Sequence, residues 1–196
     1  MRAAVYSGSF NPLHIGHLAI IRYLVNEAGF ERVHLVVSPK NPLKEGISSS
    51  TGQERHKAAL EAVARHAGEF GGTDPEYGSR KVIADGIELA MPEPHYTIRT
   101  LDAMKAAHPD DTFTLVMGAD NLADIRRWRD YKRILTEYGV MAYPRKGFDL
   151  HSIRRSLMEE IPDSRIDIMD AANVDISSTE IRKALAQGKD MSGYLM

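Results

Sequence analysis

Six short apolar runs alternate along the chain with longer segments that carry apolar residues at helical spacing. The runs cover residues 3–8, 32–39, 81–85, 112–118, 139–144 and 165–170. They are rich in β-branched residues and almost continuously apolar, which is typical of strands that are covered on both faces. The pattern therefore predicts a mostly parallel sheet.

The segments between these runs predict helices. Apolar residues in 16–29 fall on one helical face, and 96–109 is a similar stretch that ends at a proline. In 50–68, Thr51 and Glu54 have the spacing of a capping box. Strands that alternate with helices indicate an α/β fold, in which a doubly wound, Rossmann-like sheet carries helices on both faces.

Two stretches interrupt this alternation. Residues 38–52 hold two prolines and many small polar residues, so we expect a long loop after the second strand. Residues 68–80 are rich in glycine and are expected to form a surface insertion. Because no repeat or linker divides the chain, we expect a single domain over 1–196.

Composition excludes several classes of protein. The 196 residues are 43% apolar and 27% charged, with a formal net charge of −2, so no global basic field favours nucleic acid or an anionic membrane. The absence of cysteine excludes disulfides, a thiolate nucleophile and a cysteine-based zinc site. No apolar run suits a signal peptide or a membrane span. We therefore expect a cytoplasmic protein.

The turn after the first run, "SGSFNPLHIGH", concentrates residues that suit phosphate binding. Ligands of open α/β sheets bind beyond the carboxyl ends of the strands. Gly8 and Ser9 let backbone amides approach a phosphate, and Gly16 allows close approach to the opening helix. His14 and His17 share one side of the first helical turn and would flank an anion there. Either histidine alone would be about as well explained as a surface or core residue without a ligand.

A second candidate lies near the other end of the chain, in "DISSTEIRKAL". Ser177 and Glu180 form a capping-box pattern, so a helix is predicted to begin here. Read alone, the stretch requires nothing more than this cap. Ser178 and Thr179 nevertheless place hydroxyls and amides at the positive end of the helix, and Arg182 adds a fork-shaped donor one turn later. This arrangement would make a second anion site.

Both motifs carry a family resemblance. "HIGH" resembles the H-x-G-H signature of the nucleotidylyltransferase superfamily, and "ISSTEIR" resembles its ISSTxIR motif. "SPKNPLK", "YTIRTL" and "GADNLADIRRW" resemble segments of the bacterial nicotinate-mononucleotide adenylyltransferases. These enzymes join ATP to nicotinate mononucleotide in NAD biosynthesis and release pyrophosphate. The resemblance implies in-line attack without a covalent intermediate or a general base, because the attacking phosphate is already an anion.

The resemblance also implies roles for individual residues. The catalytic residues would be His14, His17, Lys44 and Arg182. ATP would be bound by Gly8, Ser9, Phe10, Gly16, Gly118, Asp120, Ile176, Ser178 and Thr179. Asp120 would accept hydrogen bonds from the ATP ribose; otherwise it is only the N-cap of the next helix. Mg²⁺ is expected on the ATP phosphates, and no carboxylate cluster has the spacing of a protein metal site.

The pyridine side of the site is less closely defined. Thr97 and neighbouring amides would bind the nicotinate carboxylate, and Trp128 would either stack on the pyridine ring or pack within the fold. A basic cluster surrounds this tryptophan: Arg126, Arg127, Arg129, Lys132 and Arg133. It is either a solvated face, or a contact to the mononucleotide phosphate or to another subunit of a homo-oligomer. Leu43 replaces a histidine that is common in relatives, which weakens the assignment of Lys44.

Three alternatives to this function remain at the level of sequence. Two are adenylyltransferases of the same superfamily, acting on nicotinamide mononucleotide or on phosphopantetheine. The third is a regulator that binds nucleotides without turnover. The two histidines and Arg182 argue against a regulator, because nucleotide binding alone does not need all of them.

Overall fold

A computed structural model describes residues 1–39, 51–170 and 177–196. Its centre is an eight-stranded sheet with the order β3-β4-β5-β2-β1-β6-β7-β8. The strands are β1 (Arg2–Gly8), β2 (Arg32–Val37), β3 (Thr73–Asp74), β4 (Gly78–Ser79), β5 (Val82–Asp85), β6 (Thr112–Gly118), β7 (Val140–Tyr143) and β8 (Ile166–Ile168). The five pairings between neighbouring strands from β5 to β8 are parallel, as the apolar runs predict, whereas β4 pairs antiparallel with β3 and β5.

Helices follow most of the strands. The α-helices are α1 (Ile15–Asn26), α2 (Gly52–Arg65), α3 (Ile87–Ala90), α4 (Thr97–Ala107), α5 (Ala119–Ala123), α6 (Tyr131–Arg133), α7 (Leu150–Glu160) and α8 (Ser178–Ala186). Shorter turns are the 3₁₀ helices η1 (Ile125–Arg127) and η3 (Ser192–Tyr194) and the π-helical η2 (Ile134–Tyr138). No helix in the described ranges is long and apolar enough to cross a membrane.

Each face of the sheet has its own apolar core. Ala4 and Tyr6 of β1 pack with α1 and α2 on one face, whereas Ala3 and Val5 pack with α4, α5 and α7 on the other. Adjacent residues of β1 thus point in opposite directions, as the two-residue period of a strand requires. Helices therefore cover both faces, which confirms the doubly wound fold expected from the sequence.

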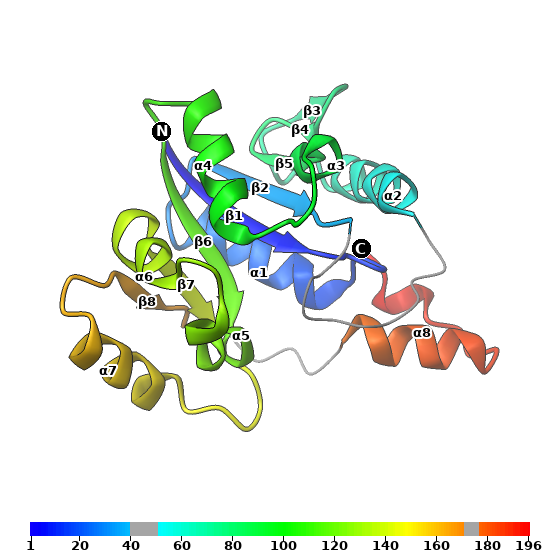
Figure 1. The fold of residues 1–196 in the computed structure, drawn as a ribbon. Coiled ribbons are helices and arrows are strands. Elements are labelled where there is room, and N and C mark those ends of the chain that lie inside the picture. Colours follow the sequence, from blue (N-terminus) through cyan, green and yellow to red (C-terminus); the bar gives the residue numbers. More distant parts are fainter. Residues whose placement is uncertain (40–50, 171–176) are drawn as a thin grey trace.

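The chain changes direction across the sheet between β1 and β6. The chain moves from β1 outward through β2 on one side, and later returns to pair β6 with the other side of β1. Figure 1 shows β1 and β6 side by side, with α8 lying beyond the carboxyl end of β1. Such a switch point leaves a crevice outside the strand ends, where ligands of these folds bind.

The glycine-rich segment 68–80, expected from sequence as a surface insertion, contains two short strands. It contributes β3 and β4, which extend the sheet beyond β5. Phe70 is fully buried, and the Ser79 hydroxyl donates a hydrogen bond to the Val82 carbonyl at 2.8 Å. Strands of two residues are too short to show a period of two in the sequence, so this hairpin left no hydrophobic pattern to detect.

Candidate active site

A cavity of about 350 Å³ lies at the carboxyl ends of β1 and β6. Eleven of the residues predicted for the site line it: Gly8, Ser9, Phe10, His14, His17, Thr97, Asp120, Trp128, Ser178, Thr179 and Arg182. Gly16 and Gly118 lie beside lining residues rather than on the cavity surface. Lys44 and Ile176 lie outside the described residues. The two motifs from opposite ends of the chain thus meet in one cavity.

The two histidines are oriented by the backbone of their own turn. His14 is the N-cap of α1, and its Nδ1 accepts the amide of Gly16 at 3.1 Å. The His14 amide in turn donates to Nδ1 of His17 at 3.2 Å, so the two rings complete a capping box. Because each Nδ1 accepts a hydrogen bond, the proton of each neutral ring lies on Nε2. Both side chains can therefore donate from Nε2.

The environment keeps both rings neutral. Burial and, to a lesser extent, the nearby Arg145 guanidinium lower the pKa of His14 to about 4. Burial also lowers the pKa of His17 well below its usual range, with His14 and Arg145 adding to the effect. The His14 and His17 ring centroids lie 3.8 Å apart, and Phe10 packs edge-on against His17 at 5.3 Å. Two neutral donors are thereby fixed side by side.

Helix α8 is attached directly to this turn. Ser177 caps the helix and forms the predicted capping box with Glu180. The Ser178 hydroxyl donates to the Pro12 carbonyl at 3.1 Å, and Arg182 donates to the Asn11 carbonyl at 2.6 Å. The first turn of α8, which is the positive end of the helix, therefore faces the same cavity as the histidines.

The end of β6 supplies a further polar group. Helix α5 begins at Ala119 with Gly118 as its N-cap, so the alternative assignment of Asp120 as the N-cap is wrong. Asp120 instead lies in the first turn, where its carboxylate is 3.9 Å from the Arg145 guanidinium. A Cβ on Gly118 would press on the Asp120 carboxylate and lie 3.2 Å from the Tyr143 ring. Glycine is therefore required for this close packing.

Arg145 is a cavity residue that the sequence analysis missed. It follows β7, lines the cavity and lies 5.1 Å over the Tyr143 ring. Its Nε is buried without a hydrogen-bond partner among the described residues. The available signal was its position, because it comes two residues after a strand whose carboxyl end reaches the ligand-binding edge of the sheet.

Trp128 packs within the fold and also lies where it could meet a ligand, so stacking on the pyridine ring stays a prediction. Its ring packs against the apolar core beside α4 and α5, and it also lines the cavity. The indole Nε1 is buried and has no hydrogen-bond partner among the described residues. Tyr96 and Thr97, at the start of α4, lie in the same cavity wall. This part of the wall combines an aromatic face with the N-terminus of an 11-residue helix.

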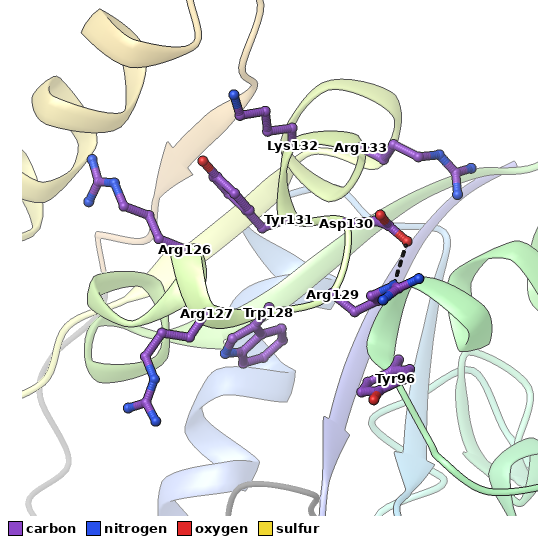
Figure 2. A pocket seen from close by; sticks show the side chains of 9 residues that line it. All are labelled: Tyr96, Arg126, Arg127, Trp128, Arg129, Asp130, Tyr131, Lys132 and Arg133. Atoms are coloured by element: carbon purple, nitrogen blue, oxygen red, sulfur yellow. Dashed lines mark ion pairs between the residues drawn. The ribbon is translucent and has the colours of Figure 1, made fainter.

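The basic cluster around Trp128 separates into distinct environments (Figure 2). Arg126 donates to Glu160 at 2.7 Å, and Arg133 bonds both Asp102 and Glu137, so these two cations stabilise the fold. Arg127 and Arg129 instead line the main cavity. Together with Tyr96 and Trp128 they also line an adjoining open hollow of about 560 Å³. Arg126, Lys132 and Arg133 line this hollow as well, so the whole cluster borders it, although Arg126 and Arg133 are also paired with acids.

The comparisons with known proteins agree with this geometry. Residues 5–184 match the family model described as cytidylyltransferase-like, so the fold and the cavity are those of a nucleotide-transferring class of protein. A probable nicotinate-nucleotide adenylyltransferase of Porphyromonas gingivalis is 34% identical over 100% of this chain and 89% of its own. Another, from Flavobacterium johnsoniae, is 31% identical over 100% of this chain and 92% of its own. The chain belongs to the cytidylyltransferase-like family, within the branch of the nicotinate-nucleotide adenylyltransferases.

Solved structures resemble the fold. Plasmodium falciparum nicotinic acid mononucleotide adenylyltransferase complexed with NaAD superimposes with a TM-score of 0.75 at 20% identity, covering 99% of this chain and 90% of that one. A putative nicotinate-nucleotide adenylyltransferase from Vibrio parahaemolyticus gives a TM-score of 0.58 at 21% identity, covering 100% and 93%. At these identities the likeness shows the Rossmann-like architecture alone.

Proposed function

We propose that this protein transfers the adenylyl group of ATP to nicotinate mononucleotide, yielding nicotinate adenine dinucleotide and pyrophosphate. The relatives carry the name of this activity. The observation that carries the proposal is the direct attachment of the α8 N-terminus to the histidine turn, through Ser178 and Pro12. Two neutral donors and a helix N-terminus then face one anionic ligand.

The reaction needs charge stabilisation more than proton transfer. An oxygen of the mononucleotide 5′-phosphate attacks the α-phosphorus of ATP, and the bond to the departing pyrophosphate breaks. His17 and His14 donate from Nε2 to the phosphate oxygens as charge moves onto them. Ser178, Thr179 and Arg182 bind the β- and γ-phosphates at the α8 N-terminus. None of these residues has to remove a proton, because the nucleophile is already ionised.

Of the remaining lining residues, some bind ATP and the others bind the mononucleotide. Asp120 accepts hydrogen bonds from the ATP ribose, and Gly118 lets the adenosine lie close to the end of β6. Thr97 and the first amides of α4 bind the nicotinate carboxylate, while Trp128 covers the pyridine ring. Arg127 or Arg129 is close enough to this wall to pair with the mononucleotide phosphate.

Magnesium is proposed to enter already bound to the ATP phosphates. In the part of the chain that the structure describes, no group of three histidine or acidic side chains could hold a metal ion. The ion would supply positive charge on the triphosphate, which complements the neutral histidines.

The test is an assay of pyrophosphate release from ATP and Mg²⁺ with nicotinate or nicotinamide mononucleotide as acceptor. We expect release with the nicotinate form, and a loss of kcat of about 10²–10³-fold in His17→Ala, as for removal of a donor to transition-state charge. Preference for the nicotinamide form would move the protein to another branch. Wild-type protein that binds ATP but releases pyrophosphate with neither acceptor would contradict the proposal.

A further inference from the structure

A buried arginine outside the cavity wall connects the two loops that border the nucleotide. Arg55 of α2 is only 4% exposed. Its guanidinium donates to the carbonyls of Ser9 at 2.7 Å, Ser38 at 2.8 Å and Pro39 at 2.9 Å. Ser9 belongs to the histidine turn and Ser38 to the exit of β2, and both residues line the cavity. One side chain thus bonds the two loops that lie on either side of the proposed triphosphate site.

The bond to Ser9 determines where the next amide points. In a trans peptide the carbonyl and the following N–H point in opposite directions. When Arg55 holds the Ser9 carbonyl toward α2, the Phe10 amide is aimed away from α2. Phe10 lines the cavity, and α2 contributes no residue to it. The guanidinium therefore orients a backbone donor toward the cavity side of the turn.

The conformation of Phe10 needs such support. Its φ of 44° lies in the left-handed region, which is unfavourable for a bulky residue. Backbone conformations of this kind persist where surrounding contacts enforce them, and they concentrate at ligand sites. The Phe10 ring is buried and packs edge-on against Tyr6 and His17. Packing of the ring against Tyr6 and His17 fixes the Phe10 side chain, and Arg55 fixes the peptide between Ser9 and Phe10.

Among the described residues, no acid forms an ion pair with Arg55. Each of its bonds within the described residues goes to a neutral main-chain carbonyl, and its Nε is buried without a partner there. An arginine stays protonated even when buried, so its positive charge remains behind the turn. That charge favours an anion on the opposite side of the Ser9 peptide.

We propose that Arg55 is a positioning residue for ATP, which holds the Ser9–Phe10 peptide so that its amide meets the triphosphate. This role rests on the proposed adenylyl transfer, because it requires a nucleotide phosphate at the histidine turn. Arg55 itself does not touch the substrate. It acts through the backbone it fixes.

The test compares Arg55→Lys and Arg55→Met with Val63→Ala, a change at a fully buried position of the same helix that does not line the cavity. We expect both Arg55 variants to weaken ATP binding by about tenfold or more, measured by calorimetry without turnover, since lysine keeps the charge but not the fork. Val63→Ala should lower Tm but leave ATP affinity within twofold. In amide NMR spectra, ATP should shift the Phe10 resonance in wild type and much less in Arg55→Lys.

Two results would overturn the role of Arg55. One is ATP affinity within twofold of wild type in folded Arg55→Lys and Arg55→Met. The other is an equal loss of affinity in Val63→Ala at a matched decrease in Tm, which would make the effect a general consequence of instability. A failure of adenylyl transfer itself would appear separately, as absent pyrophosphate release from wild type that binds ATP normally.

Discussion

At the scale of single residues, the histidines of the first turn combine a structural and a chemical task. Their Nδ1 atoms cap the helix that carries them, and their Nε2 atoms remain donors for a ligand. Because the same rings are buried and neutral, the turn that would bind ATP is also a site where acid acts on stability.

The lowered pKa of His14 predicts acid sensitivity. Between its usual value of 6.5 and about 4, the unfolded chain binds a proton at this residue and the folded chain does not. The contribution of neutral His14 to the free energy of unfolding is complete above pH 6.5 and is lost as the pH falls toward 4. His14→Asn keeps a capping oxygen and removes the titration. As the pH falls from 6.5 to 4, we expect the Tm of His14→Asn to decrease by a few degrees less than the Tm of wild type. A change of about 1 kcal/mol in the free energy of unfolding shifts Tm by roughly 2–4 °C in a chain of this length.

The exposed His151 provides the control for this experiment. His151→Asn should have the same Tm as wild type at every pH, because an exposed histidine is solvated in both the folded and the unfolded chain. An identical pH dependence in wild type and His14→Asn would contradict a neutral, buried His14.

Gly118 gives a second prediction at this scale. Its backbone conformation suits any residue, so an added methyl group acts only through crowding against Asp120, Tyr143 and Arg145. We expect Gly118→Ala to raise the KM for ATP by about tenfold, equivalent to 1.4 kcal/mol. Gly68→Ala is the matched control, because a Cβ there meets nothing within 4 Å. An unchanged KM for ATP in Gly118→Ala would show that the carboxyl end of β6 does not contact the bound nucleotide.

The sequence predicted which residue types gather at the site better than it predicted their partners. Glycines, histidines and hydroxyls at strand exits follow a local rule, so their convergence could be foreseen. The mutual capping of His14 and His17 could not, because histidine is not a usual N-cap residue. Arg55 was missed because it acts through contacts distant in sequence that no local pattern records. Arg145 was missed although its position just after β7 was a usable signal.

At the scale of elements, α2 and α8 begin with the same device in different surroundings. Thr51 and Ser177 each form a capping box with a glutamate three residues later, and both boxes were predicted from spacing. The start of α8 faces the cavity, whereas α2 contributes no residue to the cavity. The pair therefore separates the stability of a cap from its effect on a ligand.

We expect Ser177→Ala and Thr51→Ala to lower the free energy of unfolding by similar amounts, about 1 kcal/mol each. Ser177→Ala should raise the KM for ATP by about fivefold, because the first turn of α8 then holds Ser178 and Thr179 less firmly. Thr51→Ala should raise it less, because α2 acts on the cavity only indirectly, through Arg55. Chemical denaturation and steady-state kinetics measure the two effects. Equal KM values in the two variants would show that the α8 N-terminus does not bind the nucleotide.

At the scale of the whole molecule, both cores contribute residues to the cavity, whereas the β3–β4 edge of the sheet contributes none. The doubly wound architecture was predictable, because continuous apolar strands alternate with amphipathic helices. The β3–β4 extension was not, since its buried residues are few and irregularly spaced. It joins the face built on α1 and α2, away from the cavity wall.

Phe70 tests this separation. Removing its fully buried ring in Phe70→Ala should lower the free energy of unfolding by about 3–5 kcal/mol. At a temperature where the variant is folded, kcat and both KM values should match wild type, because Phe70 does not line the cavity. A changed KM for ATP with an intact fold would mean that the edge of the sheet is coupled to the site.

The bond between Ser178 and Pro12 joins residues 166 positions apart. A ribosome synthesises the histidine turn early and α8 late, and domains fold as their segments emerge. Through most of translation the growing chain therefore holds only one of the two segments proposed to bind the phosphates. Nascent chains should neither sequester ATP nor be stabilised by it. Protection by ATP against a protease would then mark the moment at which synthesis has delivered α8 to the turn made first.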